Sequence, residues 1–252
     1  MKLRIVLILF VSCCSISFAQ NNQIDSKGRK QGEWVKFYPN SKVPVYVGQF
    51  IDDKPTGKFT YYYPSNKVKM IVKHNHIDAS SEAFMYYENK NILAHGIYRN
   101  QEKDSVWTHY AENGRLSFKE TYKKGTLHGK KTIFYVPYDP NDKSLVILSE
   151  KTFENGVANG PTKEFFPDGV LKMEGNYVDG AFDGIVKRYH PSGSLHILER
   201  WKNRKRHGWW ITYGEGGKEL GRVYYYMGEP LEGEDLKKHM QKMKELGINP
   251  NN

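Results

Sequence analysis

Histidines are the residues whose type and spacing most directly suggest chemistry in this sequence. His74 and His76 are one residue apart, so on a strand both imidazoles would lie on one face and could bind a metal ion. No acidic residue or further histidine lies at a spacing that completes such a site, and we interpret the two as an ordinary surface pair. His128 and His207 each directly precede a glycine, and this shared position favours a structural role in a turn over acid–base catalysis.

Carboxylates and motifs give no stronger indication of catalysis. Asp168, Asp179 and Asp183 lie close together in the sequence, but turns favour aspartate at all three places. The sequence contains no nucleophile elbow, phosphate-binding loop, dinucleotide fingerprint or zincin helix. We therefore predict no catalytic residues, no cofactor, no metal site and a protein that is not an enzyme. An enzyme that acts on cell-wall glycans through a carboxylate pair is the alternative from a different class.

Basic residues offer a chemistry of binding instead. The chain has 252 residues and a formal net charge of +10, and its lysines and arginines concentrate at predicted turns. Such turns could attract anionic lipid, lipopolysaccharide or another acidic polymer, or they could simply be solvated. The densest run supplies a candidate anionic-surface patch, which consists of Lys202, Arg204, Lys205 and Arg206.

Aromatic residues, 14% of the chain, are the second kind of candidate binding residue. Stacked rings along a curved sheet could hold a sugar or a peptide. Rings at one phase of a repeat could equally stack and bury one another, and the two roles are compatible if one sheet face stays in contact with water. The candidate aromatic ladder, structural or binding, consists of Phe37, Tyr62, Tyr86, Tyr110, Phe134, Phe165, Tyr189 and Tyr213.

An internal repeat positions these residues. Each ladder residue stands five positions after the start of a unit, and the starts are spaced by 24 or 25 residues except for one interval of 31. Turn residues follow the ladder residue, and then a second run alternates apolar and polar residues, so each unit is predicted to be a β-hairpin. The eight starts are Gly32, Gly57, Ser81, Ser105, Gly129, Gly160, Gly184 and Gly208.

The repeat resembles a known family, the MORN (membrane occupation and recognition nexus) repeat. Residues 32–41 are similar more specifically to the bacterial variant of this repeat, which occurs in exported proteins and in chains labelled antitoxin-like. The resemblance covers about residues 28–230. The motifs that carry it are Tyr122-x-x-Gly125-x-x-x-Gly129, Tyr177-x-x-Gly180-x-x-x-Gly184 and Tyr225-x-x-Gly228.

Two units depart from the family pattern. In unit three, Ser81 replaces the starting glycine and Ala83 replaces an early aromatic residue. Unit five has an enlarged loop near residues 136–143. We expect these two units to be bent or locally irregular.

The N-terminus reads as a signal peptide over residues 1–20. Lys2 and Arg4 precede a short apolar stretch, and small residues lead to a polar start, which predicts cleavage near Ala19. Removal of the leader also removes both cysteines and lowers the formal charge from +10 to +8. A loose lipobox that ends at Cys13 is the alternative, and it would attach the protein to a membrane surface. The protein is expected to be periplasmic, associated with the outer membrane or secreted.

The predicted fold class is all-β: about eight MORN-like hairpin units of 24 residues that form an elongated, curved sheet with a short C-terminal capping helix. The repeat domain covers 21–230, and a helix and tail follow over 231–252. Leu236, Met240, Met243 and Leu246 would share one helical face, which could cover the last strand edge or dock a partner.

We interpret the chain as a non-catalytic, exported protein-binding or scaffolding module of the bacterial envelope, whose repeated patches would bind an extended partner. One alternative is docking to anionic lipid or polysaccharide through the basic turns, with peripheral membrane association. Another is an antitoxin-like neutralising protein, which conflicts with the leader if the toxin is cytoplasmic. Nucleic acid is not an expected partner, because an exported protein rarely meets it. The sequence leaves the oligomeric state open.

Overall fold

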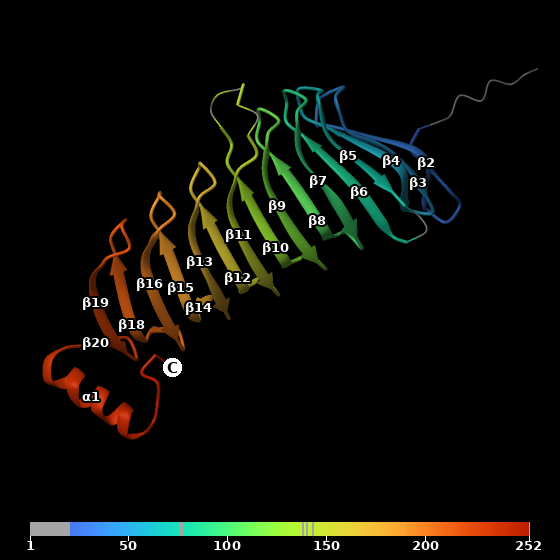
Figure 1. Ribbon diagram of the computed structural model, residues 1–252. Helices are drawn as coiled ribbons and strands as arrows, with labels where there is room; N and C mark the ends of the chain where they lie inside the picture. Colours follow the sequence, from blue (N-terminus) through green and yellow to red (C-terminus); the bar gives the residue numbers. More distant parts are fainter. Residues whose placement is uncertain (1–20, 76–77, 138, 140, 143, 252) are drawn as a thin grey trace, which may run out of the picture.

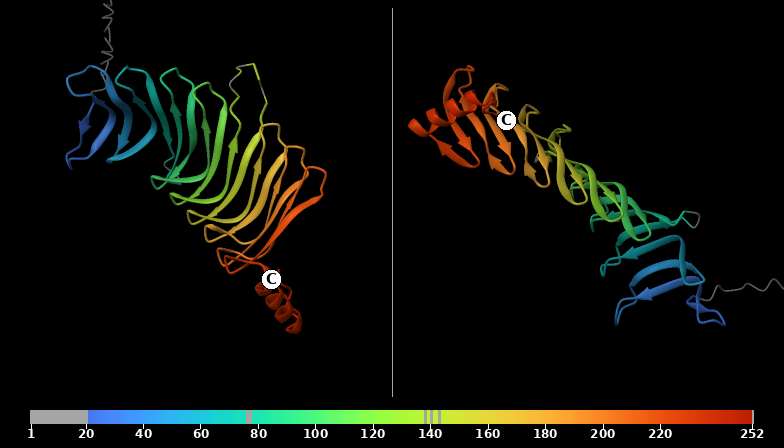
Figure 2. Two further views of the ribbon diagram at one scale, coloured as in Figure 1. Left: turned by 90° about the vertical axis from the view of Figure 1, so that its left-hand side faces the viewer. Right: turned by 90° about the horizontal axis from the view of Figure 1, so that it is seen from below.

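The protein is a single antiparallel sheet of twenty strands that runs almost the length of the chain. The computed structural model describes residues 21–75, 78–137, 139, 141–142 and 144–251, so the predicted leader lies outside the described residues. Strands follow one another side by side in chain order and form a ribbon one layer thick (Figure 1). The ribbon twists along its length, as two further views show (Figure 2). The all-β hairpin-repeat fold predicted from the sequence is confirmed.

Each unit contributes one hairpin, as its alternating pattern predicts. In the last two units the first strand is interrupted near the unit start and is therefore divided into two short pieces. The hairpins are, in order, β2 Lys30–Phe37 and β3 Pro44–Ile51; β4 Lys54–Tyr62 and β5 Val68–His74; β6 Ser80–Tyr86 and β7 Ile92–Arg99; β8 Glu102–Tyr110 and β9 Leu116–Lys123; β10 Thr126–Phe134 and β11 Ile147–Glu154; β12 Val157–Phe165 and β13 Leu171–Val178; β14 Ala181–Phe182, β15 Gly184–Tyr189 and β16 Leu195–Lys202; β17 Lys205–Arg206, β18 Gly208–Tyr213 and β19 Glu219–Tyr226. Short strands β1 Gln23–Ile24 and β20 Glu229–Leu231 pair at the two ends.

The two long edges of the ribbon carry different turns. Along the lower edge in Figure 1, two-residue turns such as Lys124-Gly125 and Asp179-Gly180 have positive φ at both residues, the geometry that suits a twisted hairpin. Their amides also bond to the neighbouring hairpin, as when Gly125 N donates to the Lys103 carbonyl at 2.8 Å. Along the upper edge, longer turns place Asn or Gly at positive φ, for example Asn66 and Gly114. Asp168 lies in an upper turn and Asp179 in a lower turn, as expected. The same expectation is wrong for Asp183, which lies in the break between the two pieces of a strand at residues 182 and 184, where its N–H donates to the Asn176 carbonyl at 3.0 Å.

Units three and five depart from the repeat in different ways. Ser81 pairs with His74 in an unbroken register, whereas the starting residues of other units, such as Gly129, have positive φ next to a register shift. Unit five keeps the pairing of the other units from Gly129 to Phe134, including the register shift before Phe134, and its extra residues belong to the connection between β10 and β11. Local irregularity is therefore confined to the upper loop in unit five.

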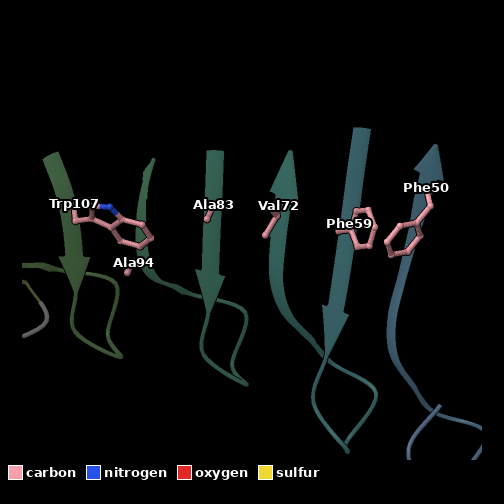
Figure 3. Close-up of a cluster of buried hydrophobic side chains, with 6 residues drawn as sticks. All are labelled: Phe50, Phe59, Val72, Ala83, Ala94 and Trp107. Carbon is pink, nitrogen blue, oxygen red and sulfur yellow. The ribbon is translucent and has the colours of Figure 1, made fainter. Parts of the chain in front are cut away.

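The core is a row of side chains along one face of the sheet, which we call face A. It contains Phe50, Phe59, Val72, Ala83, Ala94 and Trp107, all 9% exposed or less (Figure 3). Large and small residues complement one another: a Cβ on Gly48 would lie 2.3 Å from the Phe59 ring, and a Cβ on Gly96 would lie 2.4 Å from the Trp107 ring. Glycine is therefore required beneath both rings, and this close packing gives a one-layer sheet a core.

The helix α1 Gly233–Glu245 ends the fold and packs against the lower end of the last hairpin. Its His239 ring lies 5.3 Å from the ring of Tyr224, which is 1% exposed, and 4.5 Å from that of Tyr226. Leu236, Met240 and Met243 are half-buried, but Leu246 is 58% exposed, so the predicted apolar face ends one turn early and His239 takes part in it. The helix leaves the upper part of the last strand edge uncovered, in contrast to the cap we expected.

Candidate functional site

The eight ladder residues lie on the opposite face, face B, close to the upper edge. Phe84 follows the core residue Ala83 and therefore points to face B, where it stacks on His95, which in turn stacks on Tyr110. A register shift occurs immediately before the ladder residue in all eight units. The repeat phase of the ladder is thus the phase of a β-bulge, whose extra residue lies on the second strand of the hairpin, as Leu93 does between Ile92 and Ala94.

The ladder is only partly buried. Phe37 is 52% exposed at the N-terminal end, Phe134 is 9% exposed, and the other six residues are half-buried. The Tyr189 hydroxyl donates to Glu174 at 2.8 Å, and burial together with this carboxylate raises the pKa of Tyr189 to about 12. The ladder is therefore a half-open row of rings rather than the main core.

A second aromatic position, one residue further on, was missed by sequence reasoning. The hydroxyl groups of Tyr38, Tyr63 and Tyr87 donate to the carbonyl oxygens of Tyr62, Tyr86 and Tyr110 in the next unit, at 2.8, 2.8 and 2.9 Å. In unit seven, His190 Nε2 lies 2.9 Å from the Tyr213 carbonyl in the same arrangement. The tyrosine pairs in the sequence were the available signal: the first ring belongs to the ladder and the second joins neighbouring units.

A groove on face A crosses β3 to β7 and has a volume of about 1060 Å³. Aromatic rings form one wall, and Tyr98 forms the other. Strand pairing places His74 and Ser81 side by side between these walls, with Val72 next to Phe59. The rings of the first wall are Tyr46, Phe50, Phe59 and Tyr61.

The groove exists because unit three is atypical. Its strand β6 contributes Ala83, where units one, two, four and eight have an aromatic ring, and Ser81, where six of the other units have a glycine. Because the side chains of Ala83 and Ser81 are small, the aromatic rings on either side project beyond them and form the walls of the groove. We expected these two departures to make the backbone of unit three irregular. The strand is regular, and what the departures change is the volume of the side chains. The departures were therefore the signal for the groove.

His74 is the central polar group of the groove. Its Nδ1 lies 2.8 Å from Ser81 Oγ, and its ring meets the Phe59 ring edge-on at 5.1 Å. Its Nε2 is buried and has no hydrogen-bond partner among the described residues. Burial lowers the pKa of His74 and raises those of Tyr61 and Tyr98, so all three are neutral at pH 7. His74 is thus half-buried and not the surface residue we expected, and His76 lies outside the described residues.

The groove can therefore recognise shape and apolar surface with a few hydrogen bonds. Lys54 is the one charged residue among the described residues that line it, and the remaining polar groups are hydroxyls, amides and the His74 imidazole. Flat rings give contact area at low entropic cost, and a small number of polar groups fixes orientation. A side chain or a ring of a partner fits this chemistry.

Buried carboxylates form a different kind of cluster further along face A. Glu120 is 7% exposed and accepts hydrogen bonds from Lys131 Nζ and the Tyr122 hydroxyl, both at 2.8 Å. Burial by itself would raise the pKa of Glu120, but these two bonds outweigh it and the pKa lies below its ordinary value. Glu199, 4% exposed, is held in the same way by Arg188 at 2.6 Å and by Trp201 Nε1 at 3.0 Å. Sequence reasoning did not find either carboxylate.

The candidate anionic-surface patch lies on the lower edge between β16 and β18, and all four of its side chains are exposed. Two of them already make contacts within the fold. Arg204 donates to the Asp179 carbonyl at 3.0 Å, and the Arg206 guanidinium lies 4.7 Å from the Trp210 ring. Lys202 and Lys205 complete the patch.

No group of three or more potential metal ligands occurs among the residues that the structure describes. In the same part of the chain, no helix has the length and apolar character needed to cross a bilayer.

Comparison with known proteins identifies the repeat. The family model of the MORN repeat variant matches residues 55–76, 103–124, 158–179 and 182–203. The first match covers β4 and β5, which carry much of the groove, and the last covers β15 and β16. The resemblance read from the tyrosine and glycine spacing is thereby confirmed. No curated protein matches the chain significantly.

Proposed function

We propose that this protein of MORN repeat variants is a non-catalytic binding module that holds a partner protein in its face A groove and acts as a scaffold in the bacterial envelope. The observation that carries the proposal is the groove itself, an aromatic cleft of about 1060 Å³ on an otherwise continuous sheet. Protein interfaces favour aromatic anchors in desolvated pockets surrounded by neutral contacts. The fold supports partner binding at this groove, because the packed core of face A holds the aromatic rings of the groove in place.

A partner segment would insert an apolar or aromatic side chain between the first wall and Tyr98. The buried Nε2 of His74 would then gain a hydrogen-bond partner, which removes the penalty of an unpaired buried polar atom. The other polar lining groups, such as Ser80 and Asn100, would pair with the partner's backbone. Export into the envelope is supported by the charged and apolar pattern of residues 1–20.

The test is a comparison of two tryptophan substitutions at equivalent repeat positions. Thr56→Trp fills the groove, since Thr56 lines it and precedes the start glycine of unit two. Asn159→Trp places the same bulk before the start glycine of unit six, away from the groove. Tagged full-length protein carrying either substitution would be crosslinked in its own envelope fraction, and recovered partners would be identified by mass spectrometry.

We expect wild type and Asn159→Trp to recover the same partner and Thr56→Trp to lose it. Recovery that is equal in all three proteins would reject the groove as the binding site. Sequencing the N-terminus of the recovered protein tests export, with cleavage near Ala19 expected. Recovery that is lost only in high salt would instead favour docking through Lys202, Arg204, Lys205 and Arg206, because exposed charge contacts are screened by salt.

A further inference from the structure

The last long strand of the sheet is paired along only part of its outer edge. β20 pairs with the lower end of β19 at Tyr224, Tyr225 and Tyr226. Within the part of the chain that the structure describes, no strand pairs with the outer side of residues 219–223 (Figure 1). Leu220 is 68% exposed there and Val223 is 36% exposed. An edge of this kind offers backbone groups to another strand.

β20 is the beginning of a ninth repeat that is not completed. Pro230 pairs with Tyr225 in the same way as Phe182 pairs with Tyr177 and Arg206 pairs with Trp201. Glu232 therefore occupies the start position of a ninth unit, 24 residues after Gly208. The helix α1 begins directly after Glu232, where the upper part of a first strand would otherwise continue. The outer side of β19 is therefore unpaired where the upper part of this strand would have lain.

The direction of the free backbone groups follows from strand geometry. Tyr226 and Glu229 face each other across a two-residue turn, and Tyr224 faces Leu231. Because alternate residues of an antiparallel strand direct their N–H and C=O groups to the same side, those of Arg222 also point outward. A strand that bound to residues 219–223 would therefore continue the backbone hydrogen bonds that β20 makes with residues 224–226.

A second copy of the chain does not fit this edge in the register of the repeat. The corresponding end strand β2 is already partly covered, since β1 pairs with Lys30 and Gln31. The Asn22 side chain also bonds both backbone groups of Val35, at 2.7 and 3.1 Å. If β19 of one copy met β2 of another as neighbouring units do, β1 would occupy the place of the lower end of β19, and β20 would occupy that of the lower end of β2. Both ends thus block head-to-tail continuation.

We propose that the outer edge of residues 219–223 binds an extended peptide segment of a partner protein, which adds as the missing upper strand of the ninth repeat. This site is separate from the groove, which lies at the other end of the ribbon. The added strand lies next to the end of β20, pairs with Arg222 through backbone hydrogen bonds and runs antiparallel to β19.

Packing at the apolar unit junctions indicates the size of the side chain that faces Val223. At these junctions Gly96 lies beneath the large Trp107 ring and Val72 faces the small Ala83, whereas a charged pair, Glu120 and Lys131, takes the same positions at the next junction. Val223 stands fifteen residues after its unit start, as Val72 does. The partner strand therefore carries a small residue opposite Val223, and a large one would collide with the valine.

The probe is the peptide Ala83–Tyr87 of this chain, with both ends blocked, because its alanine already faces a valine in the intact sheet. Isotope-labelled full-length protein would be titrated with it and followed by amide chemical shifts, which detect weak binding. We expect shifts at residues 219–223 and slowed amide exchange at Arg222. N-methylation of Phe84, which would face Arg222, should weaken binding about tenfold, whereas N-methylation of Met85, whose N–H points away, should not.

A further probe tests the size rule. The same peptide with Trp in place of Ala83 should bind at least about tenfold more weakly if Val223 selects a small residue. Absence of shifts at residues 219–223, or equal weakening by the two N-methylated peptides, would overturn the proposal. Self-association of the protein in sedimentation, with the β19 shifts lost on dilution, would overturn it in favour of a second copy.

Discussion

The central row of face A differs between the two halves of the ribbon. In the N-terminal half it runs through Phe59, Val72, Ala83, Gly96 and Trp107 and is apolar throughout. In the C-terminal half, the equivalent positions hold Glu120, Lys131, Lys151, Thr162 and Glu199 among apolar residues. The same backbone is thus stabilised by close apolar packing at one end, whereas at the other end two buried ion pairs, Glu120 with Lys131 and Glu199 with Arg188, interrupt the apolar packing.

This difference indicates a division of roles. Hydrophobic packing is insensitive to pH and salt, and it supports the rigid rings of the groove. Buried ion pairs cost desolvation energy and are strong only while every partner is present. We therefore expect the N-terminal half to respond to changes of volume and the C-terminal half to changes of charge.

The largest expected effect is the loss of the Trp107 side chain. Trp107 is 0% exposed, and Trp107→Ala should lower the free energy of unfolding by about 3–5 kcal/mol. Its counterpart in unit eight, Trp210, is only half-buried, so Trp210→Ala should cost clearly less. Denaturant unfolding of the two variants measures the difference, and equal losses would contradict the division between the halves.

Adding a single methyl group should break the N-terminal packing almost as effectively. In Gly96→Ala the new Cβ would lie 2.4 Å from the Trp107 ring, which cannot move away, and a loss of about 2–3 kcal/mol is expected. Gly221→Ala is the control in the other half, because nothing lies within 4 Å of its Cβ position. Thermal unfolding checks both, and a stable Gly96→Ala protein would show that the ring has room to shift.

The third prediction tests charge in the C-terminal half. Glu120→Gln removes the partner of Lys131 and should cost about 1–2 kcal/mol at pH 7. Because the folded-state pKa of Glu120 lies below its ordinary value of 4.5, the stabilisation is present above that pH and is lost as the pH falls through the lowered pKa. The variant should therefore lose less stability than wild type on acidification. Glu82→Gln, in an exposed pair with Lys73, should change stability by under about 0.5 kcal/mol.

The smallest effect concerns the bonds between units. Tyr63→Phe removes the hydroxyl that donates to the Tyr86 carbonyl and should cost about 0.5–1 kcal/mol. Tyr62→Phe removes a neighbouring hydroxyl on the ladder, and since the structure gives that group no such bond, a smaller change is expected. Paired melting curves decide whether these bonds add measurable stability to the apolar half.

Much of the fold could be predicted because each unit repeats the same turn residues and the same alternation of apolar and polar residues. Turn residues such as Pro167-Asp168-Gly169 and the alternation around Met173 fix each hairpin, and the constant spacing fixes the order of the strands. The position of each bulge could not be read in the same way. The second strand of every hairpin has one extra residue opposite the ladder residue, and such a bulge leaves little trace in a single sequence.

The candidate site was harder to predict, because it arises where the repeat is weakest. Ala83 and Ser81 show in the sequence as departures, but only the packed sheet reveals that their small volume opens a groove beside Phe59. Similarly, Glu120 and Glu199 look like exposed strand residues until their partners Lys131 and Arg188 are seen on neighbouring strands. The burial of these side chains depends on contacts with neighbouring strands, which the sequence of a single strand does not show.

The enlarged connection in unit five has a consequence for how such proteins change. β10 and β11 pair from Gly129 with Phe153 to Phe134 with Ile147, with the same shift before the ladder residue as in the next unit, although residues 135–146 separate them. The upper edge therefore absorbs added chain without any adjustment of the sheet beneath it. Every other upper turn is an equivalent point of insertion, so a lineage of these proteins can acquire new loops one hairpin at a time, and an engineer can graft a recognition segment or a tag at the same positions.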